Sequence, residues 1–332
     1  MMPLVSVIVP FYNLERYVSA CLDSVIAAAG LADCAAVGVE VVCVDDGSTD
    51  STPRLLDEYA ASKSAPWLSI RVIHQPNGGE GAARNTGISA ARGEWLTFLD
   101  GDDMWLENHL KVALPLLRIH PDADMVALKY AQFDDGSAAP APTCAEGRVF
   151  DLSGGIVSGL VLEVGVFPTF FRRGFIAGAK FSALPLGADR LFTAQCLARA
   201  EKVVKCDAVV HGYRVRAGSM ARAAWDARKV VSQCDYAFGS LEALAVSGRR
   251  IGREGLAYLA SLWLSDVPNR VSRLKGDARR GVWERWRGTL GSGCVRTLPR
   301  FDRVRRLLRG SAGVSMRFSL IVARLLRKGG LS

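Results

Sequence analysis

The sequence predicts an α/β protein with a mostly parallel β-sheet flanked by helices. Two observations predict this class: short apolar runs alternate with helix-length segments over the first hundred residues, and two of those runs end in carboxylates beside a glycine. Strands separated by helices of this length form βαβ units, in which the strands lie parallel. With 332 residues, 49% of them hydrophobic, the chain is long enough to bury a core of normal size.

The first hundred residues supply four strands and three helices in alternation. Continuous apolar runs predict the strands, and apolar residues at helical spacing predict the helices. Pro53 suits the first turn of the second helix, where its missing N–H is tolerated. In chain order we expect a strand at 5–9, a helix at 14–29, a strand at 40–44, a helix at 51–59, a strand at 69–74, a helix at 79–91 and a strand at 95–99.

After residue 103 the alternation becomes less regular. We expect a helix over 105–120, a strand within 123–132, a Gly/Ala/Pro-rich loop over 134–143 and helical segments over 224–290. The sequence shows no internal repeat at a fixed period. The second half therefore predicts a less regular continuation of the α/β domain, followed by a C-terminal helical extension.

The net charge of +9 belongs to one end of the chain. Residues 295–332 contain ten Lys or Arg and one acid, and the other residues are neutral overall. As a helix, this tail would place Phe301, Val304 and Leu308 on one face and arginines opposite. Such a segment is typical of a helix on an anionic membrane surface; a helical cap with a solvated basic face is the alternative. Nucleic-acid binding is not expected, because the basic residues share the helix with an apolar stripe.

The cysteines and the apolar segments indicate the compartment. Eight cysteines are scattered without a Cys-x-x-Cys pair, which is typical of reduced, structural thiols. The first apolar run lacks a basic leader, so we interpret it as a strand and not as a signal peptide. No stretch of eighteen uninterrupted apolar residues occurs. We expect a cytoplasmic protein, peripheral on the inner face of the cell membrane.

Carboxylates gather where two of the predicted strands end. Asp46 follows the second strand, and Asp100 and Asp102 follow the fourth. Because α/β proteins bind ligands at the carboxyl ends of their strands, we expect one shared cleft there. The spacing of Asp100 and Asp102 suits Mg²⁺ or Mn²⁺ shared with a substrate phosphate. A solvated Asp-rich turn is the alternative.

Three further segments suit a nucleotide. Pro10 and Tyr12 end the first strand, where an aromatic ring can lie against a base; an ordinary strand-to-helix corner is the alternative. Asp46 can accept a hydrogen bond from a base, while the residues after it cap the next helix. The glycine-rich stretch 77–87 opens a helix whose N–H groups and Arg84 guanidinium suit a diphosphate. That stretch is neither a P-loop nor a Rossmann fingerprint.

Taken together, these segments resemble the family 2 inverting glycosyltransferases of GT-A fold. The resemblance rests on order and spacing in four stretches: Val5–Asn13, Val44–Asp50, Ala83–Gly87 and Phe98–Asp103. It implies that the first half of the chain binds a nucleotide-sugar, usually a UDP-sugar.

The resemblance also implies roles for individual residues. Asp46 would contact the uracil, Tyr12 would lie near the base, Asp100 would approach the ribose and the metal, and Asp102 would ligate the metal. Within the same family a Gly-Glu-Asp-x-x-Phe segment supplies the base that takes the acceptor proton. Here Asp189 keeps the position of that base, while Ala188 replaces the Glu. An Asp that caps the following helix is the alternative.

A basic segment follows the expected base. Tyr213–Met220 resembles the Tyr-Arg-x-Arg-x-x-Ser segment of the same enzymes and suits folding over a diphosphate. His211 lies just before it and is a candidate third metal ligand, although histidine is as often a packed or solvent-facing residue.

The sequence therefore predicts a metal-dependent inverting glycosyltransferase that moves a sugar to an acceptor hydroxyl in surface polysaccharide or glycolipid synthesis. The acceptor is expected to be a saccharide or a lipid-linked molecule. Two alternatives stay open: transfer to a polyprenyl phosphate, and a non-catalytic nucleotide-binding membrane scaffold. The expected parts are a catalytic domain over 1–220, with a nucleotide-sugar half (1–110) and an acceptor half (111–220), a helical region over 221–294 and the basic tail over 295–332.

Overall fold

The computed structural model describes residues 4–32, 38–63, 65–153 and 165–217, together with short stretches between 228 and 284. The chain divides into two compact units. The first unit comprises 1–151, 164–183 and 200–222, and the second comprises 152–163, 184–199 and 223–332. The predicted boundaries at 220 and 294 stay predictions, and the basic tail lies outside the described residues.

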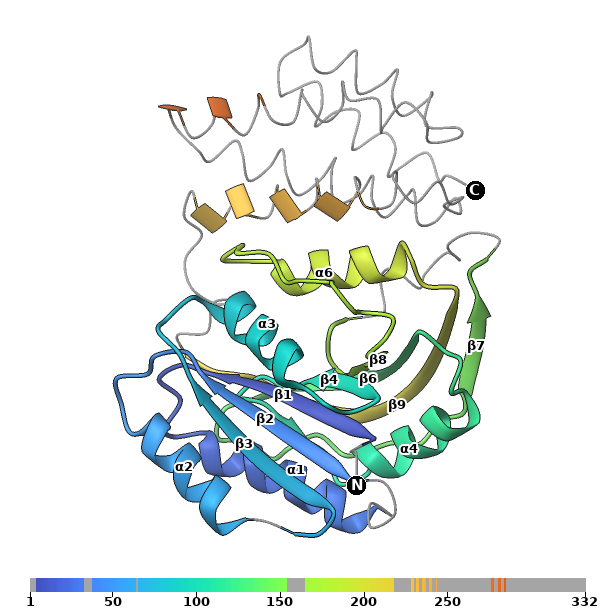
Figure 1. Cartoon of the computed structure of the whole chain (residues 1–332), viewed down its shortest axis with the longest axis horizontal. Coiled ribbons are helices and arrows are strands. Elements are labelled where there is room, and N and C mark those ends of the chain that lie inside the picture. Colours follow the sequence, from blue (N-terminus) through green and yellow to red (C-terminus); the bar gives the residue numbers. More distant parts are fainter. Residues whose placement is uncertain are drawn as a thin grey trace. The chain divides into compact units, whose positions relative to one another are not determined.

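The first unit is built on one mixed β-sheet (Figure 1). Its described strands run in the spatial order β3-β2-β1-β4-β8-β6-β9-β5, and β7 also pairs with β9. Strands β1 to β4 pair in parallel, whereas β8, β5 and β7 each pair antiparallel with a neighbour. The strands are β1 (Val5–Phe11), β2 (Val39–Asp45), β3 (Leu68–His74), β4 (Trp95–Phe98), β5 (Met104–Trp105), β6 (Met125–Asp134), β7 (Gly147–Asp151), β8 (Thr169–Arg172) and β9 (Lys202–Val215).

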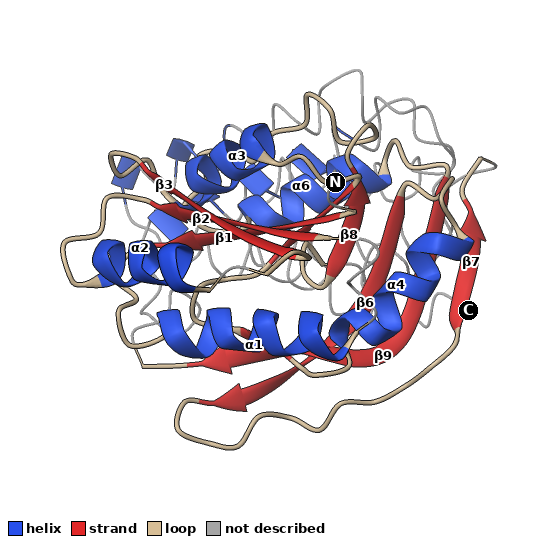
Figure 2. Cartoon of the chain, turned by 60° about the horizontal axis from the view of Figure 1, so that its bottom comes forward, coloured by secondary structure: helices blue, strands red, loops and turns tan. Residues whose placement is uncertain are grey.

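Helices cover both faces of the parallel strands (Figure 2). Helices α1 (Val18–Leu31), α2 (Thr52–Ser62) and α4 (His109–Ile119) lie on one face, and α3 (Glu80–Ala90) lies on the other. The burial pattern explains this arrangement, because alternate side chains of a strand point to opposite faces. Val41 of β2 packs into the core under α1, while Val42 and Val44 pack against Ala83 of α3. Strands that are buried on both faces therefore appear in the sequence as continuous apolar runs.

The small residues of α3 let this helix approach the sheet closely. A Cβ atom added to Gly87 would lie 2.3 Å from Cγ2 of Ile8 in β1, closer than two carbon atoms can approach. The predicted Gly/Ala-rich helix is therefore confirmed, and its composition follows from its packing against β1.

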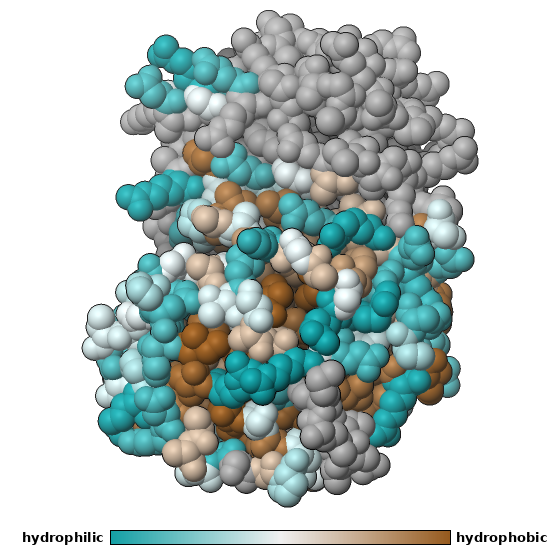
Figure 3. Space-filling model, in the orientation of Figure 1, coloured by the Kyte–Doolittle hydropathy of each residue, from teal (hydrophilic) through white to brown (hydrophobic). Residues whose placement is uncertain are grey.

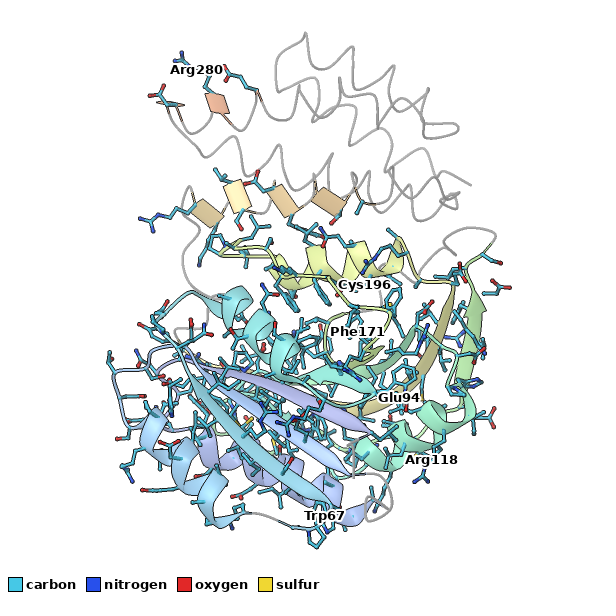
Figure 4. The ribbon with its side chains drawn as sticks, in the orientation of Figure 1. Trp67, Glu94, Arg118, Phe171, Cys196 and Arg280 are labelled. Atoms are coloured by element: carbon cyan, nitrogen blue, oxygen red, sulfur yellow. The ribbon has the colours of Figure 1, made fainter. Side chains whose placement is uncertain are left out.

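The α/β fold class and the strand–helix alternation of the first hundred residues are confirmed. The predicted helix over 105–120 starts later, at His109, because Met104 and Trp105 pair with β9 instead. The 14-residue strand β9, its partner β7, and strand β8, which pairs with β4 and β6, were not predicted. In this part of the sheet Phe171 of β8 packs against Phe98, with ring centroids 5.9 Å apart (Figure 4).

In the second unit, helix α6 (Ala188–Leu197) begins after Gly187, whose φ of 85° is left-handed. Ser232 of the same unit donates a hydrogen bond from its Oγ to the Leu186 carbonyl, and the same oxygen accepts one from the Leu186 N–H. These two bonds fix the chain just before α6.

The described surface in Figure 3 carries hydrophilic side chains interspersed with hydrophobic patches. Among the residues that the structure describes, no helix has the length and apolar character needed to cross a membrane.

Candidate active site

The sheet brings the two acidic turns together as predicted. Strands β2 and β4 both pair with β1, one on each side, so that their carboxyl ends meet at the end of β1. The Asp46 N–H donates to the Phe11 carbonyl at 2.9 Å, and the Leu99 N–H donates to the Ile8 carbonyl at 3.1 Å. Both turns are thus fixed by backbone hydrogen bonds to the same strand.

Gly101 allows the second turn to lie against β1. A Cβ atom at this position would be 2.5 Å from the Phe11 ring and 2.9 Å from the Pro10 carbonyl oxygen. Any side chain would push the turn away from the strand. The Asp-Gly-Asp order of the motif is therefore a packing requirement as well as a source of carboxylates.

Arg84 holds Asp100. The guanidinium donates from Nη2 to Asp100 Oδ1 at 2.6 Å and to Glu80 Oε1, one helical turn earlier, at 2.5 Å. It also lies over the Phe181 ring, 5.2 Å from the centroid. Arg84 is only 2% exposed. The structure therefore brings two predicted donor-site residues together, with Arg84 directed at the carboxylate of Asp100.

Asp102 is paired with Arg216. The Arg216 Nε donates to Asp102 Oδ2 at 2.5 Å, and Arg214 donates from its Nε to the Asp102 carbonyl at 2.7 Å. Burial and repulsion by Asp100 nevertheless raise the pKa of the Asp102 carboxyl above its ordinary value. This carboxylate lies in a region with too little positive charge to stabilise it fully.

Asp103 fixes β9 beside this turn. Its Oδ1 accepts the Arg214 N–H at 2.7 Å, and its Oδ2 lies 3.1 Å from His211 Nε2. Asp103 and His211 are both buried, and burial raises the pKa of Asp103 to about 6 although His211 opposes the shift. His211, considered above as a third metal ligand, thus faces Asp103 in this structure.

Tyr17 and Asp135 support the two arginines. The Tyr17 hydroxyl donates to Asp135 Oδ2 at 2.8 Å, and Arg214 Nη1 lies 3.2 Å from Asp135 Oδ1. The guanidinium groups of Arg214 and Arg216 lie over the Tyr17 ring, 5.4 and 5.6 Å from its centroid. The sequence analysis missed both supporting residues, since neither stands in a recognisable motif.

Asp46 organises the glycine-rich loop. Its Oδ1 accepts hydrogen bonds from Gly78 N and Gln75 Nε2, and its Oδ2 accepts one from Gly79 N, all within 2.9 Å. The side chain is 2% exposed. A carboxylate with this many N–H partners acts as the hub of the loop that leads into α3.

Tyr12 and Pro10 lie at the end of β1. Pro10 is buried within the strand, and Tyr12, directly after the strand, is 48% exposed. The next residue, Asn13, adopts a left-handed φ of 52° and accepts the Thr49 N–H at 2.7 Å through its Oδ1. The Tyr12 ring is thus exposed to solvent at the carboxyl edge of the parallel strands.

Asp189 lies in the second unit, in the first turn of α6. Its backbone carbonyl accepts a hydrogen bond from the Thr193 hydroxyl at 2.9 Å. The assignment of Asp189 as the acceptor base stays a prediction.

The carboxylates of the turn fit a divalent cation that is completed by a substrate. Among the described residues, no three His, Cys, Asp or Glu side chains form a group able to hold a metal ion by themselves. Mg²⁺ is commonly held by one or two carboxylates together with substrate phosphates. Asp100 and Asp102 supply such a pair, and the raised pKa of Asp102 indicates a place where added positive charge would be favourable.

Comparison with known proteins agrees with this geometry. The family model described as "Glycosyl transferase family 2" matches residues 6–167, which include every carboxylate of the two turns. This part of the chain belongs to glycosyltransferase family 2. The predicted family and enzyme class are therefore confirmed.

Curated relatives share parts of this glycosyltransferase. The uncharacterized glycosyltransferase EpsJ of Bacillus subtilis is 46% identical over 103 residues, which cover 31% of the chain and 27% of EpsJ. The glycosyltransferase GlyA of Streptococcus pneumoniae is 26% identical over 294 residues, which cover 82% of the chain and 39% of GlyA. The chain thus spans well under half the length of these relatives.

Solved structures share the fold. The Staphylococcus aureus TarS fragment 1–349, solved with UDP-GlcNAc, superposes with a TM-score of 0.68 at 22% identity, covering 98% of the chain and 92% of that fragment. The mannosyltransferase of Pyrobaculum calidifontis, solved with GDP-Man and Mn²⁺, gives a TM-score of 0.53 at 17% identity and covers 100% of the chain and 89% of that protein. The predicted GT-A type fold is confirmed.

Proposed function

We propose that this protein transfers a sugar, with inversion, from a nucleotide-sugar to an acceptor hydroxyl in a divalent-metal-dependent reaction. The observation that carries the proposal is the Asp100–Gly101–Asp102 turn at the end of β4, beside the Asp46 loop. TarS, solved with UDP-GlcNAc, supports a UDP-sugar as the donor. Mn²⁺ in the Pyrobaculum mannosyltransferase supports a divalent cation.

In this proposal the chain's own residues position the donor. Tyr12 stacks on the base, the loop organised by Asp46 surrounds the nucleoside, and Arg84 keeps Asp100 directed at the ribose and the cation. When bound, Mg²⁺ or Mn²⁺ would neutralise the charge that grows on the leaving diphosphate. Arg216 pairs with Asp102 in the protein itself, and its guanidinium would also contact the same diphosphate.

Asp189 is the proposed base. Attack of an acceptor hydroxyl on the anomeric carbon releases a proton, and a general base must take it. In the same proposal the protein contributes to surface polysaccharide or glycolipid synthesis. It would lie on the inner face of the membrane through residues 295–332, which are outside the described residues.

The experiment is a measurement of nucleotide-sugar binding and slow hydrolysis across UDP-, GDP- and TDP-sugars, with and without Mn²⁺. Binding of one donor that requires both Mn²⁺ and Asp102 is the expected result, so the Asp102→Ala variant is measured alongside. No nucleotide binding under any condition would contradict the proposal and favour a non-catalytic scaffold.

A further inference from the structure

Three aromatic side chains from separate segments meet beside the acidic turn. They are Tyr130 of β6, Phe167 before β8 and Tyr213 of β9, here called the aromatic trio. Their ring centroids lie 6.3 Å apart for Tyr130 and Phe167, 5.8 Å for Tyr130 and Tyr213, and 6.1 Å for Phe167 and Tyr213. Tyr130 and Phe167 have no role in the donor site described above, where the basic segment at the end of β9 contributes Arg214 and Arg216.

The register of the sheet places the trio on one face. Tyr130 pairs with His211 and Gln132 pairs with Tyr213, so that these four side chains point to the same side of β6 and β9. The Phe167 ring is nearly parallel to Tyr213, at 8°, and to His211, at 15°. The rings of Phe167 and Tyr213 therefore share one orientation, with Tyr130 tilted beside them.

The trio is open to a ligand. Residues 125–128 of β6 are buried, but Tyr130 is 44% exposed and Gln132 is also exposed. Phe167 and Tyr213 are half-buried. This surface combines ring faces with two phenol hydroxyls and an amide, so it offers apolar contact and hydrogen bonds together.

The acidic turn fixes the position of the trio. Asp103 holds β9 on both sides of Tyr213, through His211 Nε2 and the Arg214 N–H. Asp103 directly follows Asp102, the expected metal ligand. The Tyr213 phenol can donate a hydrogen bond as well as accept one.

Two cations among the described residues near the trio, Arg214 and Lys129, face elsewhere. The Arg214 guanidinium lies on the opposite side of β9, over Phe133 at 4.7 Å from the ring centroid. Lys129 pairs with Asp207 at 3.0 Å. An anionic headgroup or a phosphate would require a cation, whereas a pyranose ring requires an apolar surface for its C–H face and polar groups for its hydroxyls. The chemistry of the trio fits the pyranose.

We propose that the aromatic trio, with Gln132, binds a pyranose unit of the acceptor saccharide beside the donor site. The inference rests on the proposed glycosyl transfer and gives its acceptor a chemical class. A sugar stacked on Tyr130 and hydrogen-bonded by Gln132 would be presented next to the carboxylate turn that holds the donor.

Saturation-transfer-difference NMR on the full chain tests this proposal without requiring turnover. The probes are methyl β-glycosides of glucose, galactose and N-acetylglucosamine, with UDP or GDP as a separate probe of the donor site. Tyr130→Ala removes the exposed ring, Tyr130→Phe keeps it, and Val149→Ala removes an equally exposed apolar side chain from β7 as a control.

Wild type, Tyr130→Phe and Val149→Ala should transfer saturation to a glycoside, and Tyr130→Ala should bind it roughly five- to tenfold more weakly. Nucleotide binding should be equal in all four proteins. No glycoside contact in the wild type, or equal contact in Tyr130→Ala, would overturn the proposal. Loss of nucleotide binding in Tyr130→Ala would also overturn it, by assigning the ring to the donor site. Failure of the proposed function itself would appear separately, as a wild type that binds no nucleotide.

Discussion

The acidic turn and the aromatic trio are both attached to β9, yet they meet a ligand under opposite conditions. Asp100, Asp102 and Asp103 already have partners within the protein, namely Arg84, Arg216 and the pair of His211 and the Arg214 N–H. A cation or a diphosphate must therefore exchange with existing contacts. Tyr130 is exposed, so a sugar on the trio only adds contacts. Donor binding should accordingly depend on competition between charges, and acceptor binding on contact area.

The largest expected effect breaks the acceptor side alone. Asp189→Asn should lower transfer by roughly 10²- to 10⁴-fold, because the amide cannot take the acceptor proton. Donor binding should stay nearly intact, as checked by calorimetric titration beside initial rates. Near-normal turnover would remove Asp189 as the base and favour a polyprenyl phosphate acceptor, which is already ionised.

The second-largest effect is on the stability of the donor site. Arg84→Met leaves Asp100 without its buried counterion and should lower the free energy of unfolding by about 3 kcal/mol. Arg54→Met is the matched control. Arg54 pairs with Glu58 four residues away, as Arg84 pairs with Glu80, but both side chains of the Arg54–Glu58 pair are exposed. Its cost should stay below about 0.5 kcal/mol in the same urea titration. Equal losses in both variants would show that burial of Arg84 has no special weight.

The third effect tests the exchange of charges directly. Arg216→Gln removes the guanidinium that pairs with Asp102, so Mn²⁺ should bind roughly fivefold more tightly in the absence of nucleotide. Isothermal titration with Mn²⁺ measures this change, and Arg148→Gln, at a surface pair with Asp207, should leave it unaltered. Unchanged or weaker Mn²⁺ binding in Arg216→Gln would contradict a competition at Asp102.

The smallest effect concerns the support of the donor loop. The hydrogen bond to Asp45 raises the pKa of His74, so the folded protein holds this proton more tightly than the unfolded chain. The stabilisation that protonated His74 gives the folded protein is complete below the ordinary histidine pKa of 6.5. It is lost as the pH rises through the raised pKa of His74. The Tm difference between wild type and His74→Gln should therefore be larger at about pH 5.5 than at about pH 8.5. A Tm difference that grows with pH would contradict a raised pKa of His74.

Local patterns predicted the donor half well because its strands are continuous apolar runs joined by helices. The expectation that Asp46 and Asp100 lie at one edge required only that β2 and β4 flank β1. The partners of the carboxylates were harder to predict. Arg84 was expected to face a diphosphate, and the spacing of one helical turn between Glu80 and Arg84 was the available sign that these two side chains pair.

The second half was less predictable because its elements depend on distant pairing. Trp105 joins the sheet only because His211, 106 positions later, lies opposite it. The strand β9 contains Lys205 and Asp207, which interrupt its apolar runs and hid its length. The exposed Tyr130 and Gln132 at alternate positions were the available signal of a strand with one open face.

Two neighbouring register shifts in the pairing of β6 with β9 determine how tolerant this region is to insertion and deletion. Ala127 pairs with Lys205, and Tyr130 pairs with His211. Between these two pairs β9 therefore contains three more residues than β6. Because side chains alternate between the two faces of a strand, an odd number of extra residues moves every later side chain to the opposite face. The three extra residues therefore place the Tyr213 side chain on the same face as Tyr130, and the Arg214 side chain on the same face as Phe133. Deletion or insertion of a single residue between 205 and 211 would exchange the faces of Tyr213 and Arg214. A variant of this kind would present an arginine beside Tyr130 in place of the aromatic ring.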